Sequence, residues 1–79
     1  MQLQIISLKG VQYEGDVKSV NAKTASGEIT VLDHHLPLIT VLEKGQLVVK
    51  DTSGKETVIH TESGFLEVKE GNQAIALIS

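Results

Sequence analysis

An all-β fold is the class that the sequence predicts, and three observations lead to it. Seven glycines punctuate the 79 residues and cut most of the chain into pieces of about five to ten residues. β-Branched residues dominate between them, and no window keeps a 3.6-residue apolar period for three turns. Short strands separated by glycine turns at such intervals are typical of a β-sandwich or barrel without a long helix.

The totals describe one small domain that spans residues 1–79. The chain has no cysteine, so neither a disulfide nor a thiolate metal site can stabilise it. A single core of this size supplies only roughly 3–5 kcal/mol of stability, which favours association with a partner. Tyr13 and Phe65 are the only aromatic residues, so the core must be built from Leu, Ile and Val.

The charge pattern argues against nucleic-acid binding. The net charge is −3, and the seven basic residues are all scattered lysines. A nucleic-acid-binding domain needs a basic patch, and arginine is the usual residue for bidentate phosphate and guanine contacts. No apolar run approaches the roughly 20 residues that span a bilayer, and the first residues lack a signal-peptide pattern. We therefore expect neither a nucleic-acid partner nor direct membrane insertion.

Turn residues place the strands in order. Lys9-Gly10 ends the first strand, Glu14-Gly15 is expected to be a second turn, and Pro37 opens a strand, where its missing N–H is tolerated. Residues 51–55 form the clearest hairpin loop, because Asp and Ser can bond the local backbone and Gly54 can take a left-handed conformation. The strands that we expect cover residues 3–8, 11–13, 17–22, 29–32, 38–42, 46–50, 56–60, 65–69 and 73–79.

The last strand differs from the others because it is apolar on both faces. Residues 74–78 read Ala-Ile-Ala-Leu-Ile, whereas Leu66 and Val68 alternate with more polar positions in the strand before it. A strand of this kind is covered on both sides, either by its own domain or by a partner.

Candidate catalytic and metal sites find little support. His34 and His35 are adjacent, so on a strand their side chains would point to opposite faces, and His60 has no metal-ligand spacing to either. Ser63 precedes Gly64 without the G-x-S-x-G pattern of a nucleophile elbow. An aliphatic core of 79 residues also leaves little room for a pocket of several hundred Å³. We expect no enzyme activity, no metal and no cofactor.

Three motifs carry a family resemblance. Residues 27–40 read Gly-Glu-Ile-Thr-Val-Leu-Asp-His-His-Leu-Pro-Leu-Ile-Thr, residues 62–68 read Glu-Ser-Gly-Phe-Leu-Glu-Val, and Tyr13-Glu14-Gly15 precedes both. Together they resemble the epsilon subunit of F-type ATP synthases, which is called delta in mitochondria. The family's pattern over the first stretch runs Gly-Glu-Ile/Leu-Gly-Ile-Leu/Tyr-Pro-Gly-His-Ala-Pro-Leu-Leu-Thr. The resemblance covers essentially the whole chain without gaps.

The resemblance implies a flattened ten-stranded β-sandwich in the rotor of a proton-translocating ATP synthase. The family's domain is non-catalytic, sits in the central stalk, docks the gamma subunit to the c-ring and couples rotation to ATP synthesis. It implies a peripheral place on the cytoplasmic face of the bacterial inner membrane. The two C-terminal helices that inhibit ATP hydrolysis, and that bind ATP in some members, do not follow residue 79 here, so we expect neither activity.

The same resemblance assigns two groups of contact residues. Those expected to meet the c-ring are Ser26, Gly27 and Glu28, and those expected to face gamma are Ser7, His35 and Thr40.

Two local departures from the family's pattern matter. The family's Pro-Gly is replaced by Asp33-His34, so the tight turn must be built differently, and we expect Asp33 to bond the backbone two residues on. The family's Ser-Gly before Gly64 is Glu62-Ser63, which reduces backbone freedom there.

Two alternative classes stay open from the residues alone. One is a small β enzyme or ligand-binding barrel, which would show a filled pocket or a histidine on a metal. The other is a carrier of the biotinyl or lipoyl type, also a flat β-sandwich, with a modifiable lysine at a hairpin tip. Lys55 occupies such a position, but the residues that flank the lysine in those carriers are missing.

Overall fold

The computed structural model describes all residues from 1 to 79 and contains eight β-strands and no helix. The all-β class is therefore confirmed. The strands are β1 (Gln2–Ser7), β2 (Gly10–Thr24), β3 (Gly27–Leu32), β4 (Leu38–Leu42), β5 (Gly45–Asp51), β6 (Glu56–Thr61), β7 (Gly64–Lys69) and β8 (Gln73–Ile78).

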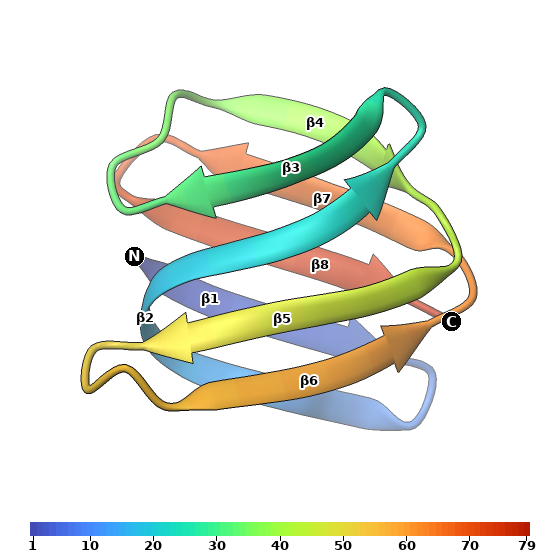
Figure 1. The fold of residues 1–79 in the computed structure, drawn as a ribbon, viewed down its shortest axis with the longest axis horizontal. Coiled ribbons are helices and arrows are strands. Elements are labelled where there is room, and N and C mark those ends of the chain that lie inside the picture. The colour runs from blue at the N-terminus through green and yellow to red at the C-terminus, as the bar shows by residue number, and fades with distance from the viewer.

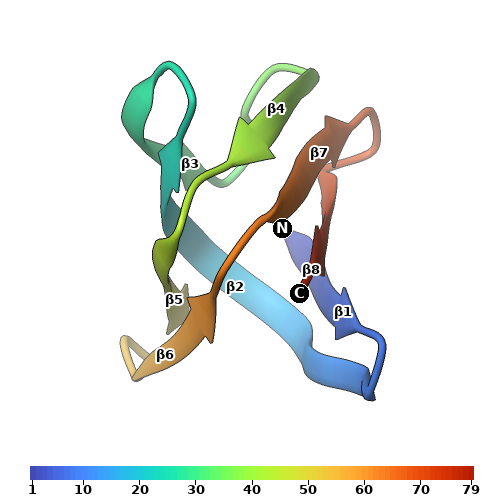
Figure 2. The ribbon, with the colours of Figure 1, turned by 90° about the vertical axis from the view of Figure 1, so that its right-hand side faces the viewer.

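Two layers of strands face each other, and the long strand β2 belongs to both (Figures 1 and 2). Its first half pairs with β1, which continues the layer β1-β8-β7-β4. Its second half pairs with β3 on one side and β5 on the other, and β6 completes that layer. β1 and β8 run parallel, and the other pairings are antiparallel.

The strand count is eight rather than ten, and the long β2 is one reason. Glu14-Gly15, expected to be a turn, lies inside β2, where Gly15 pairs with Leu3 of β1. The Tyr13 ring covers Gly15, since a Cβ added there would lie 3.8 Å from the ring atoms. An aromatic ring over a strand glycine replaces the packing that the missing side chain cannot provide, so the chain continues extended through this position.

The space between the layers is filled by aliphatic side chains that alternate along each strand. Leu3 and Ile5 of β1, Leu66 of β7 and Ala76 of β8 are all fully buried from one layer, and Val20 of β2 faces them from the other. Burying each such Leu, Ile or Val side chain contributes about 1.5–3 kcal/mol. The whole core comprises Met1, Leu3, Ile5, Val17, Val20, Ala22, Val31, Leu42, Leu47, Val49, Leu66, Val68, Ala74, Ala76 and Ile78.

The hairpin loop between β5 and β6 has the predicted chemistry. Asp51 Oδ1 accepts hydrogen bonds from the Ser53 amide (2.9 Å), the Ser53 hydroxyl (2.7 Å) and the Lys55 amide (3.0 Å). Gly54 adopts φ 90°, a left-handed conformation that glycine reaches without strain. The hydrogen bond from Ser53, followed by bonds from the loop backbone, holds the pKa of Asp51 below its ordinary value of 3.8.

Candidate functional site

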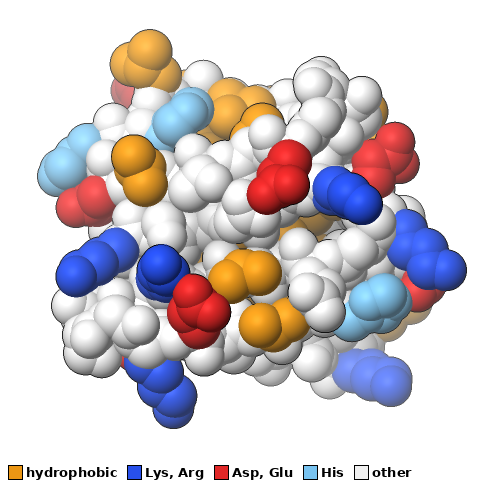
Figure 3. Space-filling view, viewed as in Figure 1, with side chains coloured by type: hydrophobic (Ala, Val, Ile, Leu, Met, Phe, Trp, Pro, Cys, Tyr) orange, Lys and Arg blue, Asp and Glu red, His pale blue; other side chains and the backbone are white.

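The two outer faces of the sandwich differ in chemistry. The face formed by β3, the second half of β2, β5 and β6 is a mixture of charged, polar and a few apolar side chains (Figure 3). On it, Asn21 donates hydrogen bonds to Glu28 (3.1 Å) and Thr30 (2.8 Å). Val58 of β6 is one of its few exposed apolar residues and lies opposite Val48. Water solvates such a face without a partner.

The opposite outer face carries a continuous line of apolar residues across five strands. Each member is the Cα partner of the next one in the neighbouring strand, from β4 through β7, β8 and β1 to the first half of β2. We call this line the apolar row; it consists of Val41, Phe65, Leu77, Ile6 and Val11. Phe65 is 56% exposed and Leu77 50% exposed. A contiguous exposed apolar patch of this kind marks an interaction surface more often than scattered single residues do.

A mixed line of residues runs beside the apolar row. Ile39, Glu67, Ile75, Gln4 and Glu14 follow one another across the same five strands. Gln4 donates a hydrogen bond of 2.6 Å to the Glu14 carboxylate. The row is thus bordered on this side by two acids, so a partner with basic groups next to an apolar strip would be complementary to it.

The unusual composition of β8 now has a structural explanation. Ala74, Ala76 and Ile78 are buried between the layers, whereas Leu77 is half exposed on the outer face. The sequence predicts that this strand is covered on both sides, but its own domain covers only the inner side. The outer side of β8 is the centre of the apolar row.

The residues expected to meet the c-ring lie together at one end of the molecule. Ser26 lies in the turn between β2 and β3, Gly27 and Glu28 are the first residues of β3, and all three are exposed. The Thr24 hydroxyl shapes this turn, because it donates to the Gly27 carbonyl (2.6 Å) and accepts from the Ser26 amide (3.1 Å). Gly27 has φ 113°, and nothing lies within 4 Å of a Cβ added there. A side chain would therefore fit sterically, but the left-handed backbone conformation favours glycine.

The three residues expected to face gamma are not brought together. Ser7 ends β1 next to Ile6 of the apolar row, whereas His35 is in the β3–β4 loop at the other end of the sandwich (Figure 1). Thr40 is half-buried and pairs with the core residue Leu66, so it shares the inner face of β4 and not the outer one. Sequence reasoning missed the apolar row, because its members come from five strands whose register the sequence does not state.

The β3–β4 turn has the features of a type II turn although Asp33-His34 is at its centre. The His35 amide donates to the Leu32 carbonyl (3.1 Å), which closes a four-residue turn, and His34 adopts φ 62° at its third position. A type II turn requires a positive φ there and favours Pro-Gly at its centre. The expectation that Asp33 bonds the backbone two residues on is wrong, because the Leu32 carbonyl already accepts the His35 amide.

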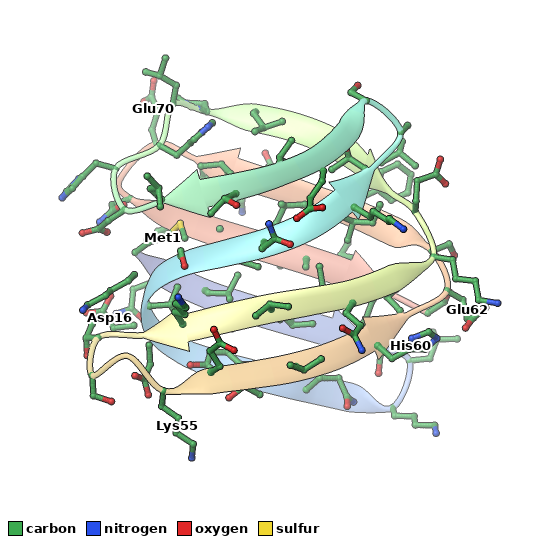
Figure 4. The ribbon with its side chains drawn as sticks, in the orientation of Figure 1. Met1, Asp16, Lys55, His60, Glu62 and Glu70 are labelled. Carbon is green, nitrogen blue, oxygen red and sulfur yellow. The ribbon has the colours of Figure 1, made fainter.

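The Asp33 side chain instead joins a cluster with the chain's first residue. Asp33 Oδ1 accepts hydrogen bonds from the Met1 ammonium (2.5 Å) and the Asn72 amide (2.7 Å), and the ammonium also donates to Asp16 (3.0 Å). Met1 and Asp16 lie at the same end of the sandwich (Figure 4). The ammonium, followed by Asn72, lowers the pKa of Asp33 from 3.8. Desolvation lowers the pKa of the Met1 amine, but the bonds to Asp33 and Asp16 outweigh it and the pKa rises above 8.0.

The surface hollows do not gather catalytic groups. One, of about 370 Å³, lies on the outer face formed by β2, β3 and β5, and is lined by Asn21, Lys23, Glu28, Gly45, Gln46 and Val48. A second, of about 340 Å³, lies between the β1–β2 turn and β6, where Ser7 and Ile59 line it. No group of three or more His, Asp or Glu side chains could hold a metal ion. No helix is long and apolar enough to cross a membrane.

Comparison with known families decides between the classes that the sequence left open. The profile of the ATP synthase Delta/Epsilon chain beta-sandwich domain matches residues 1–77. The chain belongs to this family. Its membership replaces the carrier interpretation of Lys55, which lies at the end of the β5–β6 loop.

Curated members of the family confirm the assignment at the level of sequence. The chain is 38% identical over 69 residues to the ATP synthase epsilon chain of Acinetobacter baylyi, which is 87% of this chain and 50% of that protein. It is 34% identical over 70 residues to the epsilon chain of Sulfurovum sp., or 89% of this chain and 55% of that one. The chain therefore spans about half the length of the curated relatives it matches.

Solved structures confirm the fold. A chain of the Euglena gracilis mitochondrial ATP synthase, from a structure of its OSCP/F1/c-ring, superposes with a TM-score of 0.89 at 22% identity and covers 96% of this chain and 48% of that one. A chain of the Tetrahymena thermophila central stalk and c-ring gives a TM-score of 0.83 at 13% identity, covering 99% and 62%. At these identities the likeness shows the β-sandwich fold and nothing finer.

Proposed function

We propose that this delta/epsilon domain is a non-catalytic rotor subunit that joins a gamma subunit to a c-ring in a proton-translocating F-type ATP synthase. The observation that carries the proposal is the apolar row, a line of five apolar side chains of which four are exposed, in a chain whose family match covers residues 1–77. The domain would then couple rotation to ATP synthesis by holding its two partners in fixed relation, without a reaction of its own.

The apolar row supports a firm contact with gamma. Interface energy concentrates in a few central, well-packed side chains, and aromatic residues are over-represented among them. Phe65 lies within the row, between Val41 and the central residue Leu77. Removing these half-exposed side chains from water on docking would add about 25 cal/mol for each Å² of apolar surface buried.

Ser7 and the β2–β3 turn lie at the two ends of this surface. Ser7 follows Ile6 of the apolar row, which agrees with its expected place against gamma. At the other end, the Ala25 amide donates a hydrogen bond of 3.0 Å to the carbonyl of Val41. The turn that bears Ser26, Gly27 and Glu28 is thus tied to the end of the row. One rigid body can therefore present a gamma surface and a c-ring surface side by side.

Glu28 is the residue that we assign to the c-ring contact. It is exposed and its carboxylate is oriented by the 3.1 Å hydrogen bond from Asn21, so little side-chain entropy is lost when a basic or polar loop meets it. Through this contact the subunit would sit peripherally at the membrane, on the cytoplasmic face if the host is a bacterium. His35 and Thr40 remain proposed gamma contacts outside the apolar row, since His35 lies in the β3–β4 loop and Thr40 is half-buried on the inner side of β4.

The proposal is tested by binding and by coupling. The purified chain should bind the purified gamma subunit of the same synthase, and a synthase assembled with it should couple proton flow to ATP synthesis. Glu28→Lys should leave gamma binding intact and lower ATP synthesis, whereas Thr30→Lys on the same strand serves as the charge control. A chain that does not bind gamma would refute the proposal. Unchanged coupling with Glu28→Lys would remove only the c-ring assignment.

A further inference from the structure

Asn72 connects the β7–β8 turn to the β3–β4 turn. Its side-chain oxygen accepts a hydrogen bond from the His34 amide (2.7 Å), and its side-chain nitrogen donates to Asp33 Oδ1 (2.7 Å). The Asn72 carbonyl also accepts the Gln2 amide (3.0 Å), which fixes its own backbone against β1. One amide side chain thereby contacts both central residues of the turn that precedes His35.

Both turns hold a non-glycine residue in the left-handed region, His34 at φ 62° and Asn72 at φ 57°. Asparagine is enriched in this conformation, but histidine reaches it at a cost that surrounding contacts must offset. The closing hydrogen bond of the turn uses the His35 amide, so the His34 amide needs another acceptor. The Asn72 oxygen provides that amide with a partner.

We propose that Asn72 is a positioning residue that fixes the β3–β4 turn and, through it, the place of His35 in the gamma surface. Asp33-His34 stands where the family's pattern has Pro-Gly, so the turn lacks the two residues that would form it unaided. Asn72 replaces their local preference with two tertiary hydrogen bonds. The part of the inference that concerns gamma rests on the proposed function, whereas the part that concerns the turn does not.

Amide hydrogen exchange in the free 79-residue chain tests the turn. Asn72→Gly keeps the left-handed backbone and removes both hydrogen bonds, so the His34 amide should exchange about three- to tenfold faster, the effect of losing one or two ordinary hydrogen bonds. Glu70→Ala is the matched control, because Glu70 is exposed in the same turn and makes no hydrogen bond or ion pair (Figure 4). Core amides such as that of Val20 should keep their rates in both variants.

Exchanging the two side chains provides a rescue. Asp33→Asn combined with Asn72→Asp restores a donor at residue 33, an acceptor for it at residue 72 and an acceptor for the His34 amide. The combined variant should exchange more slowly at His34 than the Asn72→Asp variant alone, in which residues 33 and 72 both carry a carboxylate that can only accept. An unchanged His34 rate in Asn72→Gly, or no recovery in the combined variant, would overturn the inference.

Affinity for purified gamma tests the second part. Asn72→Gly should weaken binding several-fold, and Glu70→Ala should not. Unchanged affinity in Asn72→Gly would overturn the role of Asn72 in presenting His35. If the unmodified chain fails to bind gamma, the proposed function fails, and the exchange rates still decide whether Asn72 fixes the turn.

Discussion

Phe65 of β7 and Leu77 of β8 are direct cross-strand partners on the outer face of the sandwich, and each leaves at least half of its side chain exposed. Cross-strand aromatic–aliphatic pairs stabilise a sheet by roughly 0.2–1 kcal/mol. A stabilisation of this size does not explain why both apolar side chains are left half exposed to water. A partner that covers the pair explains it better.

Phe65→Ser should therefore affect binding much more than folding. We expect the affinity for gamma to fall at least tenfold, about 1.4 kcal/mol, because an aromatic residue at the centre of an interface is a typical hot spot. Val58→Ser on the opposite outer face is the control, since Val58 of β6 is 52% exposed but lies outside the apolar row. Titration calorimetry and urea unfolding of both variants make the comparison. Equal losses of affinity in the two variants would contradict the role of the row.

Gly64→Ala should destabilise the fold severely. A Cβ at Gly64 would lie 2.1 Å from the carbonyl oxygen of Leu77, so the backbones of β7 and β8 would have to move apart. We expect a loss of at least about 2 kcal/mol in the free energy of unfolding, as for other overpacked sites. In Gly15→Ala the new methyl group meets the Tyr13 ring at an ordinary 3.8 Å, so a change within about 0.5 kcal/mol is expected. Urea unfolding measures both, and similar losses would show that the approach of β8 is not the cause.

His34→Gly should stabilise the chain. His34 has φ 62°, where a residue with a Cβ is strained by about 1–2 kcal/mol and glycine is not. The greater backbone entropy of glycine in the unfolded chain offsets part of this gain, which leaves about 0.5–1 kcal/mol. Thermal unfolding at neutral pH is the measurement. A lower melting temperature would mean that the imidazole makes a stabilising contact that outweighs the strain.

Stability should fall in acid, and the carboxylates with lowered pKa values set the range. The Met1 ammonium lowers the pKa of Asp33, hydrogen bonds from Ser53 lower that of Asp51, and His60 lowers that of Glu62. Their ordinary values are 3.8, 3.8 and 4.5. A carboxylate whose pKa is lower in the folded chain stabilises it above the ordinary value and loses this effect as the pH falls through the folded value.

Urea unfolding between pH 6 and pH 2.5 should thus show a decline that begins below about pH 4.5. Asp51→Asn should flatten part of this decline, because the loop carboxylate no longer titrates. A variant with the same slope as the unmodified chain would show that Asp51 contributes nothing to it.

The Met1 ammonium should make an N-terminal extension destabilising. The pKa of the amine is raised by its hydrogen bonds to Asp33 and Asp16, so its stabilising effect is complete below pH 8.0 and disappears as the pH rises through the folded value. A chain with Gly-Ser placed before Met1 should melt at a lower temperature than the unmodified chain at pH 7. The two should converge in alkaline solution, and a difference that does not change with pH would point to sterics instead.

The sequence by itself determined the all-β class, the aliphatic core and the family. Glycine spacing, β-branched composition and turn chemistry such as that of Asp51 to Lys55 are local signals, and the structure confirms the all-β class and this hairpin. That Ser26, Gly27 and Glu28 lie together could also be predicted from the chain, because they are consecutive residues; their contact with a c-ring stays a prediction.

Only the tertiary structure decided which residues of different strands meet. The apolar row depends on the register of four strand pairings, and a shift of one residue in any of them would move its members to the other face. The turn at Asp33-His34 is held by Asn72, which is 38 residues away from His34 in sequence. The sequence predicts a turn at Gly15, whereas in the structure its pairing with Leu3 and the covering Tyr13 ring keep it extended. Register and long-range hydrogen bonds arise from the packed whole, so no local pattern encodes them.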